Sequence, residues 1–108
     1  MRIGAIADLV RLGAPESLPL FVALRHDPVP MLREAAIEAI GKCGSEAEVP
    51  VLLPLLSAGS PGTRRAAAEA LSWIGGTPAA ESIAPLLADR DAGVRQEALH
   101  LLRAELQD

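Results

Sequence analysis

The chain has 108 residues, half of them hydrophobic, with a formal net charge of −4 and an isoelectric point near 5.1. This length allows one domain, and the hydrophobic content argues against a disordered chain. The acidic balance argues against a nucleic-acid-binding protein, for which a basic face is expected. No apolar run approaches the roughly 20 residues that span a bilayer, so we expect no membrane segment.

The lone cysteine, Cys43, excludes a disulfide within the chain and fits a reducing compartment. The first ten residues, MRIGAIADLV, contain an aspartate and no small-residue cleavage site, so they make a poor signal peptide. We therefore expect a cytoplasmic protein.

A period of 31 residues runs through the whole chain without a gap. The residues that recur at this interval are Gly13, Gly44 and Gly75; Arg2, Arg33, Arg64 and Arg95; Ala5, Ala36, Ala67 and Ala98; and Leu24, Leu55 and Leu86. The register divides the chain into a half repeat, 1–13, and three full repeats, 14–44, 45–75 and 76–106. A period of this size is typical of stacked, solenoid-like architectures.

In chain order, the half repeat predicts one helix and each full repeat predicts two. The first helix of a repeat carries apolar residues at helical spacing, as in Leu18, Phe21 and Val22. A tight turn follows at 27–30, 59–62 and 89–93. The second helix is rich in alanine, which lets neighbouring helices approach closely.

Local signals mark the helix ends. Ser45 with Glu48 forms a capping box, and Thr77 followed by proline is another start signal. Ser60 and Asp91 are expected N-caps of second helices, and Gly44 and Gly75 are expected helix stops. Pro54 and Pro85 lie deeper in the first helices and should kink them.

The frame D-x-x-x-x-x-R-x-A-A-x-x-A-[IL]-x-x-x-G is complete in DPVPMLREAAIEAIGKCG (27–44), and SPGTRRAAAEALSWIGG (60–76) and DAGVRQEALHLL (91–102) match it in part. This pattern resembles the HEAT-repeat family, and in its period the short HEAT-like units of phycobilisome lyases. The resemblance covers essentially the whole chain. It implies an all-α, right-handed α-α superhelix, a HEAT-like solenoid of about seven helices in a single domain, 1–108.

The resemblance also implies a ladder of hydrogen bonds between repeats, from arginines early in the second helices to aspartates in the turns. The ladder residues here would be Asp27, Arg33, Arg64, Asp89 and Arg95. Ala58 replaces the aspartate in the middle repeat, so we expect that rung to lack its acid. The ladder explains the row of arginines better than a phosphate-binding function does.

Second helices usually line the concave face of such solenoids. By register, the exposed positions that we take as candidate partner-binding residues are Glu34, Glu38, Lys42, Arg65, Glu69, Trp73, His100 and Arg103. Trp73 shares its register with Lys42, Arg11 and Ala104, so it should face outward. It is either a binding anchor, because tryptophan is frequent in interface hot spots, or a half-exposed ring that covers a neighbouring side chain. The glutamates form either an acidic patch or an ordinary solvated face with Lys42 and Arg65 interleaved.

The two ends of the chain differ. In the third repeat, Ser82, Glu97 and Glu105 replace apolar register positions, as expected of a polar cap. In the half repeat, Ile3, Ala7 and Val10 form an apolar stripe where later repeats are mostly polar. Either this helix is rotated so that the stripe packs inward, or the stripe contacts another chain, for example a second copy. We therefore expect a monomer or a weak homodimer.

No catalytic constellation emerges from the residues. Cys43 shares its register with apolar residues and should be core, and neither His26 nor His100 is placed to pair with it or to share a metal. We expect no catalytic residue, metal or cofactor. The leading hypothesis is a non-catalytic scaffold that binds a protein partner. The alternatives are a lyase-type enzyme or accessory subunit that handles a chromophore or cofactor, and an assembly element that oligomerises through its N-terminal helix.

Overall fold

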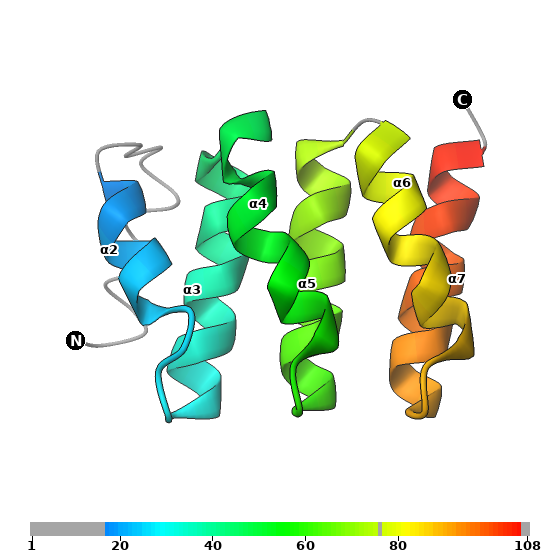
Figure 1. Ribbon diagram of the computed structural model, residues 1–108, viewed down its shortest axis with the longest axis horizontal. Coiled ribbons are helices and arrows are strands. Elements are labelled where there is room, and N and C mark those ends of the chain that lie inside the picture. Colours follow the sequence, from blue (N-terminus) through cyan, green and yellow to red (C-terminus); the bar gives the residue numbers. More distant parts are fainter. Residues whose placement is uncertain (1–16, 76, 107–108) are drawn as a thin grey trace.

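The computed structural model describes residues 17–75 and 77–106, and the half repeat with its Ile3, Ala7 and Val10 stripe lies outside them (Figure 1). The described α-helices are α2 (Leu18–Leu24), α3 (Pro30–Cys43), α4 (Val49–Leu52), α5 (Pro61–Ile74), α6 (Thr77–Ile83) and α7 (Ala92–Leu106). Short 3₁₀ helices are η2 (Glu46–Glu48), η3 (Leu53–Ser57) and η4 (Ala84–Ala88). These residues contain no strand, so the all-α fold expected from the sequence is confirmed.

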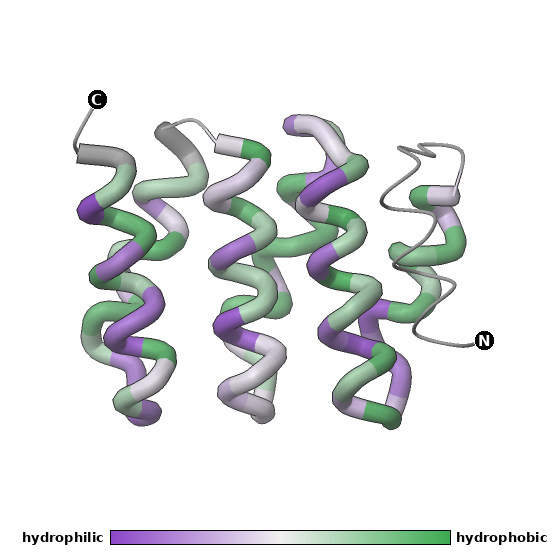
Figure 2. Tube along the Cα trace, turned by 180° about the vertical axis from the view of Figure 1, so that it is seen from behind, coloured by the Kyte–Doolittle hydropathy of each residue, from purple (hydrophilic) through white to green (hydrophobic). Residues whose placement is uncertain are grey.

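The helices form two layers. Helices α3, α5 and α7 stand side by side in one layer, and α2, α4 with η3, and α6 with η4 form the other (Figures 1 and 2). Each full repeat contributes one hairpin, with its first helix in one layer and its second in the other. Stacked hairpins of this kind make an α-solenoid, because each unit buries its apolar faces against its neighbours.

Proline shapes the first-helix layer. In the second repeat α-helical geometry ends at Leu52 and the 3₁₀ helix η3 follows, with Pro54 in its first turn. In the third repeat α6 ends at Ile83 and η4 follows, with Pro85 in the same place. Proline has no N–H to donate and its ring clashes with the preceding turn, so the α-helix cannot continue through it. The kinks predicted at Pro54 and Pro85 therefore take the form of a change from α to 3₁₀ helix.

Several of the expected end signals are present in the structure. Asp91 caps α7 by accepting from the N–H of Val94, whereas Ser60 stands at the N-cap of α5 without a side-chain capping bond and α6 begins at Thr77 itself. Ser45 and Glu48 form the capping box, in which the Ser45 N–H donates to Glu48 Oε1 at 2.7 Å, but the segment it opens is the 3₁₀ helix η2. Pro50 follows soon after, so regular α-helical bonding is interrupted here as well. Gly75 caps α5 with a φ of 83°, a conformation that side-chain-bearing residues rarely adopt.

A continuous core lies between the two layers. Its largest fully buried side chains include Phe21, Ile37, Ile40, Leu52, Leu71, Ile83 and Val94. Alanines such as Ala36, Ala67 and Ala70 are fully buried between the second helices. Helices α3 and α5 approach so closely that a Cβ on Gly41 would lie 2.6 Å from Cα of Ala70. The small residues of the repeat therefore set the spacing of the layer that carries the candidate surface.

Candidate interaction surface

The arginines of the repeat point between units. Arg64 forms a two-pronged ion pair with Asp89 of the next repeat, with Nε 2.9 Å from Oδ1 and Nη2 3.0 Å from Oδ2. The exposed fractions of the two side chains are only 4% and 9%. Arg64 Nη1 also donates to the carbonyl oxygen of Ala58 at 2.7 Å. The hydrogen bond from Arg64 lowers the pKa of Asp89 below its ordinary value, helped by the N–H of Asp91.

The rung before this one has no carboxylate, because Ala58 stands in the register of Asp89. Arg33 Nε donates instead to the hydroxyl of Thr63 at 2.7 Å, and its Nη1 donates to the carbonyl oxygen of Asp27 at 3.1 Å. Thr63 is buried, whereas the residues at its register in the neighbouring repeats, Leu32 and Val94, are apolar. The rung is thus built from a hydroxyl rather than the expected acid.

The two remaining ladder residues bind backbone within the described part of the chain. Arg95 Nη1 donates to the carbonyl oxygen of Asp89 at 2.7 Å. Asp27 Oδ1 accepts from the N–H of Val29 at 2.9 Å, and Arg2, which stands one repeat before Arg33, lies outside the described residues. The basic row therefore braces turns and neighbouring repeats, and Arg64 with Asp89 is the rung in which the structure shows an ion pair.

Trp73 lies on the outer face of the α3–α5–α7 layer with 43% of its surface exposed. Its ring edge covers Gly41 of α3, where an added Cβ would come within 2.8 Å of Cε3. The Nζ of Lys42 stands 5.3 Å from the ring centroid, a cation–π distance, and also pairs with Glu38 at 3.1 Å. One side of the ring is therefore packed against α3 and the rest is open to solvent.

Beside Trp73, carboxylates from three helices line a shallow groove, here called the acidic groove. Its cavity volume is about 240 Å³, and its lining residues include Glu34, Glu38, Arg65, Glu69 and Glu97. Burial raises the pKa of Glu69, and the negative charges of Glu97 and Glu38 raise it further. Figure 2 shows the hydrophilic bands that cross this layer. Four carboxylates against one arginine give the groove a negative potential.

Glu97 is the residue of this groove that the sequence reasoning missed. The register assigned it to a polar cap of the third repeat, but its carboxylate lies 3.9 Å from Arg65 of the middle repeat and its side chain is only 19% exposed. The oppositely charged Arg65 stands about one repeat earlier in the sequence. This pair of charges is the sequence signal that could have predicted the contact.

The structure brings six of the eight candidate residues together and leaves two apart. Glu34, Glu38, Arg65 and Glu69 line the acidic groove, and Lys42 with Trp73 adjoins it through Glu38. His100 and Arg103 are exposed on α7 and line no part of the groove. They lie on the same layer but outside the acidic groove.

The remaining observations on the described residues concern the thiol, possible metal ligands and the membrane. Cys43 is half-buried, and burial raises the pKa of its thiol, which disfavours the reactive thiolate. Within 17–75 and 77–106, no group of three or more histidine, cysteine or acidic side chains is placed to hold a metal ion. Of the helices described, none combines the length and the apolar character needed to cross a bilayer.

The comparison with protein families decides the assignment. The model for HEAT repeats matches residues 1–58 and again residues 19–103. The chain belongs to the HEAT-repeat family. Among curated proteins none matches it. HEAT repeats generally serve as protein-interaction scaffolds, and the two layers and the Arg64–Asp89 rung fit the solenoid that the family name implies.

Proposed function

We propose that this HEAT-repeat protein is a non-catalytic scaffold that binds a protein partner on the outer face of α3, α5 and α7. The observation that carries the proposal is the exposed tryptophan, Trp73, beside the acidic groove. A large aromatic ring that is held on one side and open on the other supplies contact area at a low entropic cost on binding.

The charge of the groove points to a partner segment that carries lysine or arginine. Glu34, Glu38, Glu69 and Glu97 outnumber Arg65 there, and burial makes the charged form of Glu69 costly in the free protein. A basic side chain placed between these carboxylates would relieve their mutual repulsion. Such binding weakens as salt is raised, because screening shortens the range of the attraction.

Affinity purification from the source cell tests the proposal with Trp73→Ala and a matched control, Leu53→Ala. The exposed fraction of Leu53, 38%, is similar to that of Trp73, but Leu53 lies in η3 of the other layer. We expect a protein retained by the wild type and by Leu53→Ala to be lost from Trp73→Ala. Since Trp73 is only partly buried, its truncation should lower the free energy of unfolding by about 1 kcal/mol, which leaves the protein folded.

Two results would contradict the proposal. One is a partner retained equally by both variants. The other is a bound chromophore or cofactor that co-purifies with the protein and absorbs light, since this would favour a lyase-type role instead. A loss of roughly 3–5 kcal/mol in Trp73→Ala, as for a buried aromatic residue, would show that Trp73 is core.

A further inference from the structure

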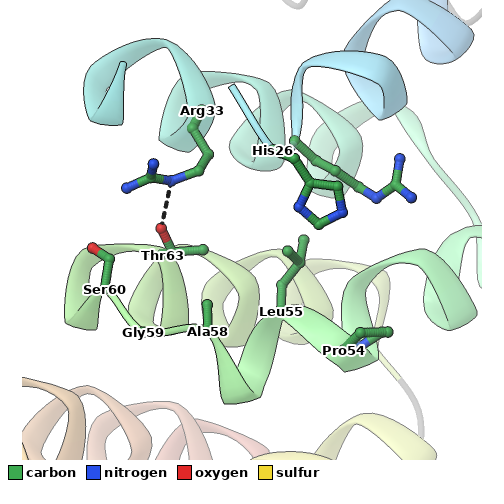
Figure 3. Close-up of a pocket in the computed structure, with 9 residues that line it drawn as sticks. His26, Arg33, Pro54, Leu55, Ala58, Gly59, Ser60 and Thr63 are labelled. Atoms are coloured by element: carbon green, nitrogen blue, oxygen red, sulfur yellow. Dashed lines mark hydrogen bonds between the residues drawn. The ribbon is translucent and has the colours of Figure 1, made fainter. Parts of the chain in front are cut away.

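A second cavity lies on the turn side of the solenoid, apart from the acidic groove. It has a volume of about 340 Å³ and lies between the α2–α3 turn and the segment from η3 to the start of α5 (Figure 3). Its polar lining consists of two arginines, a histidine and two hydroxyls: Arg25, His26, Arg33, Ser60 and Thr63. Among the residues that the structure describes, no carboxylate lines it, although the chain as a whole is acidic.

The corresponding position in the third repeat holds a carboxylate. One repeat later, the carboxylate of Asp89 accepts two hydrogen bonds from Arg64 and one from the N–H of Asp91. Asp91 in turn accepts from the N–H of Val94 at 3.0 Å. Two carboxylates of the chain thus occupy the start of α7.

In the middle repeat the same two register positions carry no charge. Ala58 stands where the third repeat has Asp89, and Ser60 stands where it has Asp91. The arginine is kept, since Arg33 corresponds to Arg64. The cavity therefore lies where the next repeat holds its carboxylates, with the guanidinium still in place.

Several donors around the cavity are free to bind a ligand. Arg33 uses Nε and Nη1 in its own hydrogen bonds, and Nη2 has no partner among the described residues. Thr63 accepts from Arg33, so its hydroxyl proton is left to donate. Ser60 is the N-cap of α5, but its side chain makes no capping bond, and His26 forms no hydrogen bond to a described residue.

We propose that this cavity binds an oxyanion, the carboxylate or phosphate group of a ligand, at Nη2 of Arg33. The corresponding Nη2 of Arg64 binds the carboxylate of Asp89 one repeat later, whereas the Nε of Arg33 already donates to Thr63. Arg33, Thr63 and Ser60 donate to its oxygens, with His26 beside them, and Leu55 with Pro54 contacts the apolar part of the ligand. Charge-assisted bonds from a guanidinium are the strong ones in such a site. Glu34 approaches Gly62 at the start of α5, but it lines the acidic groove and not this cavity.

The proposal rests on observations separate from the proposed partner surface, so either one can fail alone. The test is a titration of the ¹⁵N-labelled protein followed by NMR, with sodium succinate and inorganic phosphate as probes at constant ionic strength. We expect saturable shifts at the Gly59 and Thr63 amides and at the Arg33 Nε–H. The probe that saturates at the lower concentration tells whether a carboxylate or a phosphate is preferred.

Ala58→Asp is the decisive variant, because it supplies from the chain itself the carboxylate that the ligand would bring. It should weaken binding of both probes at least about tenfold, and Arg33→Gln should do the same if it folds. Arg103→Gln, which removes an arginine outside the cavity, should leave the dissociation constant within about twofold. The proposal is wrong if neither probe gives saturable shifts, or if Ala58→Asp binds them as the wild type does.

Discussion

Single residues show how far the 31-residue register predicts the surface. It predicted that Trp73 faces outward, because its counterparts Lys42 and Arg11 are charged, and the ring is indeed partly exposed. It could not predict that the ring covers Gly41 and meets Lys42, since this depends on the distance between α3 and α5. For the same reason it missed the approach of Glu97 to Arg65, which crosses from one helix to the next.

Glu69 provides a test of the acidic groove at this scale. Its raised pKa means that the folded state disfavours the charged form. The folded protein therefore loses stability through Glu69, and this loss is complete above the pKa of the folded state. It disappears below about pH 4, where the carboxyl is protonated in the folded and in the unfolded protein. We therefore expect Glu69→Gln to raise the melting temperature at pH 7, with the difference shrinking as the pH falls through this range.

Thermal unfolding followed by circular dichroism between pH 3 and 7 measures this effect. Glu81→Gln serves as the control, because Glu81 is exposed on α6 and lies outside the groove. A Glu69→Gln protein that melts below the wild type at pH 7 would show that the charged carboxylate is stabilising, and the groove would then be no repulsive cluster.

At the scale of elements, the sequence predicted the order of helices, their glycine stops and the positions of their breaks. It did not predict that the first helices continue as 3₁₀ segments past Pro54 and Pro85, since either a kink or a change of helix type relieves the proline clash. It also did not predict which group accepts from Arg33 in place of the aspartate that Ala58 replaces. The answer, Thr63, stands five residues further on, at a register position that is otherwise apolar.

Thr63→Val tests whether this hydroxyl links the first and middle repeats. The change keeps the shape of the side chain but leaves the Arg33 Nε–H without its acceptor in a partly buried place. We expect it to lower the free energy of unfolding by about 1–3 kcal/mol, the cost of an unsatisfied buried donor. Chemical denaturation with urea measures the loss.

Adding Ala58→Asp to Thr63→Val should restore most of that stability, because the new carboxylate can accept from Arg33 as Asp89 does from Arg64. Val94 shows that a valine is tolerated at this register when the acid is present. If Thr63→Val alone unfolds at the same urea concentration as the wild type, the hydroxyl does not carry the rung.

At the scale of the whole molecule, two layers of stacked hairpins leave three different surfaces. The α3–α5–α7 layer presents Trp73 and the acidic groove, and the turn side presents the basic cavity (Figure 3). The third surface is the α7 side of the stack. Leu99 is 43% exposed there, whereas its counterparts Ile37 and Ala68 are buried by the following repeat. Glu97, expected to be part of a polar cap, instead approaches Arg65 of the middle repeat.

Site-specific photo-crosslinking in the source cell tests most directly whether the α3–α5–α7 layer is the binding surface. A benzophenone side chain is placed at Arg65 or His100, exposed on this layer, and at Leu53 or Glu81, exposed on the other. Binding through this layer predicts that one and the same protein is crosslinked from positions 65 and 100 and not from 53 or 81. Crosslinks to that protein from 53 and 81, with none from 65 and 100, would contradict it.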